Sequence, residues 1–124
     1  MDDLVPPDVR EFIIRHIDTV SELEALLILR ENPGEAWEAG RIAARVYSSE
    51  GEIGRVLERF TAEGFLERDG ENYRYSSKDP AIDRTIGELA RSYASHLIPV
   101  TNMIHSKPRS MRSFSDAFKL RKEP

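Results

Sequence analysis

Cysteine is absent from the 124 residues, and long apolar stretches are absent as well. Without cysteine the chain can form neither disulfides nor thiolate metal sites. No run of about 18 apolar residues occurs, so we expect no membrane-spanning segment and no membrane partner. The N-terminus has neither a basic start nor an apolar stretch, which argues against a signal peptide. Together these absences predict a cytoplasmic protein.

Motifs that bind metals, bind cofactors or support catalysis are missing too. The three histidines, His16, His96 and His105, are not spaced with a carboxylate or with one another as metal ligands are. There is no Gly-x-Ser-x-Gly elbow and no glycine-rich phosphate loop. Residues 69–72 (DGEN) lack the alternating ligands of a calcium loop and are typical of a turn. We therefore predict that the protein is not an enzyme and has no metal site and no cofactor.

Basic residues outnumber acidic ones only near the C-terminus. From residue 91 onward there are seven Lys or Arg and two Asp or Glu, a net charge of +5. The first 90 residues hold the other 11 basic and 20 acidic residues, a net charge of −9. Because phosphate contacts supply most non-specific affinity for nucleic acid, an acidic body does not suit binding by bulk charge. Any DNA-binding face must therefore be a local basic one.

Two helices are predicted in the N-terminal quarter of the chain. Pro7 suits a first-turn position, and the apolar residues that follow predict a helix over 8–18. Ser21 and Glu24 are spaced as a capping box, which predicts a second helix over 22–31. That helix is apolar on much of its circumference, so we expect it to be buried on several sides.

Two short helices joined by a tight turn are predicted between residues 38 and 63. The first, over 38–47, has an apolar stripe at steps of three and four. Ser49 and Glu52 are spaced as another capping box, so a new helix begins there and has a second stripe. Gly64 suits a left-handed stop at its end. The residues of the two stripes are Ala39, Ile42, Ala43, Val46, Ile53, Val56, Leu57 and Phe60.

A β-hairpin is predicted after these helices. The aromatic-rich runs 65–68 and 73–76 flank the turn at 69–72. The order helix, turn, helix, hairpin resembles the winged helix-turn-helix domain of bacterial transcription regulators, in particular small MarR-like or PadR-like ones. The segments RIAARV, VLERFTAEGFLER and NYRYS carry the resemblance, which covers roughly residues 21–78.

The resemblance implies a mainly α fold with a small β-hairpin. A winged helix-turn-helix domain over 1–78 would precede long C-terminal helices over 79–124, which form a dimerisation extension. In such domains the second helix of the motif enters the major groove by its N-terminal end, and the hairpin contacts the backbone or the minor groove. The chain would then be a homodimeric transcriptional regulator that binds double-stranded DNA. The candidate DNA-binding residues are Ser48, Ser49, Arg55, Arg59, Arg41, Arg45, Arg68 and Arg74.

Arg55 and Arg59 lie four residues apart and so share a helix face. Arginine can read guanine or hold phosphates, and Ser48 and Ser49 stand at a helix start, where N–H groups favour anions. Residues 48–63, however, hold four Glu and two Arg, a net charge of −2. The alternative is a winged-helix module for protein–protein interaction with little or no DNA binding, whose arginines pair with neighbouring glutamates.

Three residues of this region each allow two interpretations. Trp37 either fixes the helix at 38–47 to the core or contacts the DNA backbone through its indole N–H. Gly51 and Gly54 each cost a helix about 1 kcal/mol relative to Ala. They indicate either a loosely specified helix start or a bare backbone face that a partner approaches closely.

A long helix and a dimer are predicted after residue 79. Pro80 fits a first helical position, and Pro99 should kink the helix near 95–98. A short amphipathic helix with basic flanks is predicted over 109–120, and a further alternative places the DNA contacts there. Because the long helix has more apolar surface than a small body covers, we predict a homodimer built by residues 80–120. Its coiled-coil-like seam consists of Ile86, Leu89, Tyr93, Leu97, Val100 and Ile104.

Overall fold

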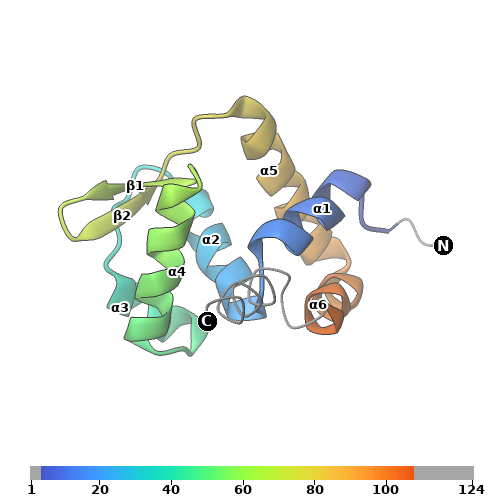
Figure 1. The fold of residues 1–124 in the computed structure, drawn as a ribbon, viewed down its shortest axis with the longest axis horizontal. Helices are drawn as coiled ribbons and strands as arrows, with labels where there is room; N and C mark the ends of the chain where they lie inside the picture. Colours follow the sequence, from blue (N-terminus) through green and yellow to red (C-terminus); the bar gives the residue numbers. More distant parts are fainter. Residues whose placement is uncertain (1–3, 108–124) are drawn as a thin grey trace, which may run out of the picture. The chain divides into compact units, whose positions relative to one another are not determined.

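The structure is a computed structural model, and it describes residues 4–107. These residues form six helices and one two-stranded antiparallel sheet (Figure 1). This confirms a mainly α fold with a small β-hairpin. The helix predicted over 109–120 lies outside the described residues. No helix in the described range is long and apolar enough to cross a membrane. The elements are α1 (Pro7–His16), α2 (Val20–Glu31), α3 (Ala39–Val46), α4 (Glu50–Ala62), β1 (Leu66–Asp69), β2 (Asn72–Tyr75), α5 (Pro80–Ser95) and α6 (Leu97–Ser106).

The chain divides into two compact units. The hairpin unit is Ser21–Ile86, and the terminal unit consists, within the described residues, of 4–20 and 87–107. The terminal unit thus includes α1 together with α6, and these two helices pack against each other. The functional division into a DNA-binding domain over 1–78 and a dimerisation extension over 79–124 stays a prediction.

In the hairpin unit, α3 and α4 form where the sequence predicts them. The Ser49 hydroxyl accepts a hydrogen bond from the Glu52 N–H at 3.1 Å, which confirms the predicted cap of α4. The two apolar stripes face each other, and Ile42 and Leu57 are fully buried. The prediction for α2 was wrong at its start. That helix begins at Val20, so Ser21 does not cap it, and its hydroxyl donates to a carbonyl of α3 instead.

The hairpin pairs β1 with β2, and one extended residue from before α3 pairs with β2. Gly70 lies in the turn with a positive φ of 66°, which glycine adopts without strain. Trp37 exchanges two backbone hydrogen bonds with Tyr73, at 2.8 and 2.9 Å, and so extends the sheet by one residue before α3. Trp37 is 2% exposed and its indole N–H is buried. Its predicted role in fixing α3 to the core is confirmed, and the indole N–H has no access to DNA.

The kinked helix predicted after residue 79 is two helices, α5 and α6. The break between α5 and α6 falls at His96, which leaves helical geometry with φ −135° and ψ 60°. Pro99 explains it, because proline has no N–H for the carbonyl of Ser95 and its ring collides with that carbonyl. The end of α6 is fixed by Lys107, whose ammonium group donates to the Ile13 carbonyl at 3.1 Å and forms further bonds at the end of α1. The sequence predicted where the helix is interrupted, but it predicted a kink and not a complete break into two helices.

Candidate nucleic-acid interface

The two arginines predicted to share one face of α4 have different surroundings. Arg55 is exposed, and no salt bridge joins it to another of the described residues. Arg59 is 23% exposed in its side chain and donates to the Glu22 carboxylate at 2.9 Å. Glu22 belongs to α2 and is itself buried. Arg59 therefore connects α4 to α2, and of this pair only Arg55 is available to a partner.

The hairpin arginines are paired with carboxylates of their own unit. Arg68 lies 2.8 Å from a Glu58 oxygen and also donates to the Gly70 carbonyl. Arg74 is hydrogen-bonded to Asp69, and that bond raises the pKa of its guanidinium. These charges are already compensated, so they attract phosphate less than free arginines would.

The arginines of α3 stack on Trp37. The Arg41 guanidinium lies 3.9 Å from the Trp37 ring centroid and pairs with Glu35 at 2.9 Å. The Arg45 guanidinium lies 5.6 Å from the same ring, is exposed, and has no salt bridge within residues 4–107. Of the six candidate arginines, Arg45 and Arg55 are therefore the two whose charge is not offset by a carboxylate in the described part of the chain.

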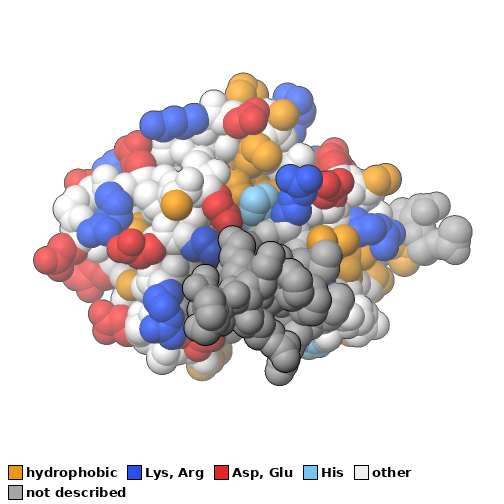
Figure 2. Space-filling model, in the orientation of Figure 1, with side chains coloured by type: hydrophobic (Ala, Val, Ile, Leu, Met, Phe, Trp, Pro, Cys, Tyr) orange, Lys and Arg blue, Asp and Glu red, His pale blue; other side chains and the backbone are white. Residues whose placement is uncertain are grey.

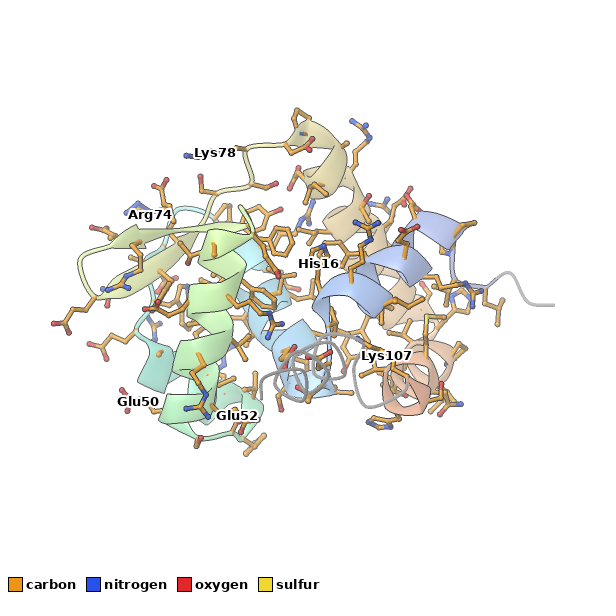
Figure 3. The ribbon with its side chains drawn as sticks, in the orientation of Figure 1. His16, Glu50, Glu52, Arg74, Lys78 and Lys107 are labelled. Atoms are coloured by element: carbon orange, nitrogen blue, oxygen red, sulfur yellow. The ribbon has the colours of Figure 1, made fainter. Side chains whose placement is uncertain are left out.

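The two acidic residues in the first turn of α4 are turned toward their own chain. Glu52 accepts a hydrogen bond from the Ser48 hydroxyl at 3.2 Å. Glu50 lies against Gly40 of α3, where an added Cβ would be 3.1 Å from its carboxylate oxygen. Figure 3 shows both glutamates at the start of α4. Gly40 thus provides the space for Glu50, a role that the sequence pattern did not indicate.

Tyr47 is a surface residue that the sequence reasoning missed. It ends α3 with φ 57° and ψ 48°, a left-handed conformation, and its side chain is 95% exposed. It is the one described residue other than glycine with a positive φ. For residues with a Cβ this conformation costs about 1–2 kcal/mol. The sequence predicted a helix through position 47, and a tyrosine there carries no signal for a left-handed turn.

A hollow of about 480 Å³ lies between α4 and the hairpin. Its lining residues are Gly51, Gly54, Arg55, Glu58 and Tyr73. The Tyr73 hydroxyl donates to Glu58 at 3.1 Å, and burial together with that bond raises the pKa of Tyr73. A Cβ added at Gly51 or Gly54 would have no atom of residues 4–107 nearer than 4.0 Å. Packing within the chain therefore does not require glycine at either position.

Acidic residues predominate over the unit that holds these features. The range 21–86 contains 14 Asp or Glu and nine Lys or Arg, a net charge of −5. On the face shown in Figure 2, acidic and basic side chains are interspersed over the hairpin and α4. The positive charge that carboxylates leave unpaired is therefore local.

The predicted dimer seam is largely buried within one chain. Four of its six residues, Ile86, Leu89, Val100 and Ile104, are at most 2% exposed. Tyr93 is half-buried and Leu97 is 48% exposed. The seam side chains open to a second copy are therefore those two, and Ile98, 63% exposed, adjoins them.

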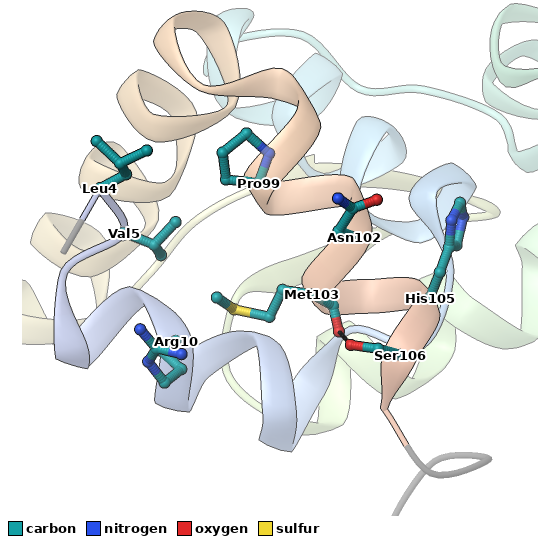
Figure 4. Close-up of a pocket in the computed structure, with 8 residues that line it drawn as sticks. All are labelled: Leu4, Val5, Arg10, Pro99, Asn102, Met103, His105 and Ser106. Atoms are coloured by element: carbon teal, nitrogen blue, oxygen red, sulfur yellow. Dashed lines mark hydrogen bonds between the residues drawn. The ribbon is translucent and has the colours of Figure 1, made fainter. Parts of the chain in front are cut away.

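A groove of about 520 Å³ lies within the terminal unit (Figure 4). Its lining residues are Leu4, Val5, Arg10, Pro99, Asn102, Met103, His105 and Ser106, none of them acidic. The walls are mostly apolar, and Arg10 is their cationic group. Within residues 4–107, no group of three or more His, Asp or Glu is placed to bind a metal ion.

Comparisons with known proteins find no matching family model, no matching curated protein and no matching solved structure.

Proposed function

We propose that the chain is a DNA-binding transcriptional regulator whose hairpin unit is a winged helix-turn-helix. The observation that carries the proposal is the placement of α4. It packs against α3 on one side and adjoins the hairpin, while its outward face holds the unpaired Arg55. The Trp37–Tyr73 pairing supports the same fold, because it adds an extended residue between α2 and α3 to the edge of the hairpin.

In this proposal the N-terminal end of α4 enters the major groove. Arg55 reads a guanine edge or holds a phosphate, and Arg45 contacts the flanking backbone. The Ser48 hydroxyl donates to Glu52, so its contribution is to hold that carboxylate. Ser49 already accepts from the Glu52 N–H, so its contribution is to fix the helix start. The paired arginines, Arg41, Arg59, Arg68 and Arg74, position the elements and add little to phosphate binding.

A homodimer completes the proposed regulator. Dimers of helix-turn-helix proteins bind two half-sites about one helical turn apart, which multiplies the contacts that one small face makes. The exposed apolar residues Leu97 and Ile98 support a contact between copies at the start of α6. Dimerisation would also double the number of unpaired arginines on the DNA.

The test is a titration of the purified protein with pooled fragments of its own genome at about 50 and 200 mM salt. We expect binding that weakens with salt and enriches particular fragments. Arg55→Ala should abolish the enrichment, whereas Arg84→Ala, which removes another exposed arginine of the same unit, should not. Equal enrichment by wild type and Arg55→Ala would reject this role of Arg55.

The internal ion pairs favour a second candidate, a winged-helix module that binds another protein. Four of six candidate arginines are bound to carboxylates, and the unit has a net charge of −5. A chain that retained no DNA at about 50 mM salt yet captured a defined basic protein through α4 would support this candidate over the first.

A further inference from the structure

Tyr47 combines an unfavourable backbone conformation with a side chain that is almost fully exposed to solvent. Its left-handed φ and ψ suit glycine or asparagine at the end of a helix. A tyrosine at such a position is usually kept for what its side chain contacts, yet this side chain is 95% exposed. The stability of the single chain therefore gives no reason for tyrosine at position 47.

Gly51, in the first turn of α4, shows the opposite mismatch between residue size and backbone conformation. Gly51 lies inside α4, where alanine is the better helix former. In the described part of the chain an added Cβ would meet only the Arg55 side chain, at 4.0 Å. Position 47 thus holds a large residue where glycine suits the backbone, and position 51 holds glycine where a larger residue fits. Tyr47 precedes α4 by three residues and Gly51 lies in its first turn, so both are near the end of α4 that is proposed to approach DNA.

We propose that Tyr47 is a DNA-contact residue whose ring lies against the sugar–phosphate backbone and whose hydroxyl donates to a phosphate oxygen. This role rests on the proposed DNA-binding function. Tyrosine is a common donor to DNA phosphates and brings no charge of its own. Both neighbouring carboxylates are held against their own chain, Glu52 by a hydrogen bond from the Ser48 hydroxyl and Glu50 beside Gly40. Gly51 then leaves the first turn of α4 without a side chain at that position, so that the DNA backbone can approach the helix closely.

The proposal predicts opposite effects on stability and on binding. Tyr47→Gly should raise Tm, because glycine adopts the left-handed conformation without strain, and should weaken binding to an enriched DNA fragment about tenfold. Tyr47→Phe keeps the ring, so its affinity should lie between those of wild type and Tyr47→Gly. Arg84→Ala, at an exposed position on α5, is the control for surface substitutions.

The experiment measures Tm by circular dichroism and affinity by fluorescence anisotropy for all four proteins at one salt concentration. Unchanged affinity of Tyr47→Gly beside a binding wild type would overturn the role of Tyr47 alone. A fall in Tm for Tyr47→Gly would also overturn it, since Tyr47 would then stabilise the fold. A wild-type chain that binds no fragment even at low salt would instead refute the proposed function, and the DNA contact of Tyr47 with it.

Discussion

The guanidinium of Arg59 lies 2.9 Å from the Glu22 carboxylate, across 37 residues of sequence. Glu22 is buried, and Arg59 places a positive charge beside its carboxylate. Removing a charged partner from a buried carboxylate is more damaging than losing an exposed ion pair. Arg59 is thereby an internal support of α4, although it follows the exposed Arg55 by one helical turn.

The pair predicts a separation of roles between two neighbouring arginines. Arg59→Ala should lower the free energy of unfolding by about 2 kcal/mol, because it removes a charged hydrogen-bond donor from the buried Glu22 carboxylate. Arg55→Ala should change it by less than about 0.5 kcal/mol, as surface substitutions usually do, but should abolish DNA enrichment. Urea unfolding and fragment binding measured on both variants would check this. Equal destabilisation by the two substitutions would contradict the assignment.

The contact between Glu50 and Gly40 predicts that α3 controls the charge at the start of α4. Gly40→Ala places a Cβ within 3.1 Å of the Glu50 carboxylate and should push it outward, where it opposes phosphate. We expect DNA affinity to fall about threefold, the effect of one like charge at the edge of an aqueous interface. In the background of Glu50→Gln the Gly40→Ala substitution should have no such effect, and anisotropy on the double-mutant cycle measures the coupling. An equal loss in both backgrounds would show that Gly40 acts through packing.

Alkaline pH should weaken the hairpin unit through Tyr75. Burial, followed by a hydrogen bond to Asp83, raises the pKa of the Tyr75 hydroxyl from 10.0 to about 12. Below pH 10.0 the phenol is protonated in both the folded and the unfolded states, so its contribution to stability is complete there. Above that value the unfolded chain binds fewer protons, and stability falls as pH rises toward about 12.

Substitution of Tyr75 tests this pH dependence directly. Tyr75→Phe removes the ionising group, so the loss of stability between pH 10.0 and about 12 should be smaller than in wild type. Chemical unfolding followed at about pH 9 and about pH 11 gives the comparison. Identical losses in the two proteins would show that other groups govern the alkaline transition.

The salt dependence of DNA binding should report how many arginines are available. If only Arg45 and Arg55 of each protomer neutralise phosphates, a dimer makes four such contacts, and log K against log salt should have a slope of about −4. If all six candidate arginines of each protomer took part, the slope would approach about −11. A measurement near the larger value would mean that the internal ion pairs open on binding.

Dimerisation should depend on the start of α6. Leu97→Asp places a charge on an exposed apolar residue and should convert a dimer to a monomer with little change in Tm. Light scattering at micromolar concentration, with circular dichroism as the control for folding, checks both parts. A monomeric mass for the wild-type chain would remove the dimer from the proposal.

Local chemistry explains which elements could be predicted from the sequence. The Ser49 cap, the apolar stripes of α3 and α4, the Gly70 turn and the interruption caused by Pro99 all depend on residues within a few positions of one another. Such features follow from helical and strand periodicity and from the special geometry of proline and glycine. The mainly helical fold and the position of its hairpin could therefore be read from the chain alone.

The use of each candidate residue was decided by tertiary structure. Arg55 and Arg59 lie on one face of α4, and only the tertiary structure brings Glu22 of α2 within 2.9 Å of Arg59. Likewise Glu50 finds space on α3 only because Gly40 lies opposite it. These contacts join residues far apart in the chain, and their energies depend on burial and distance, which no local pattern encodes. The sequence determined where the charges stand along the helices, and the folded structure decided which of them remain free to meet a partner.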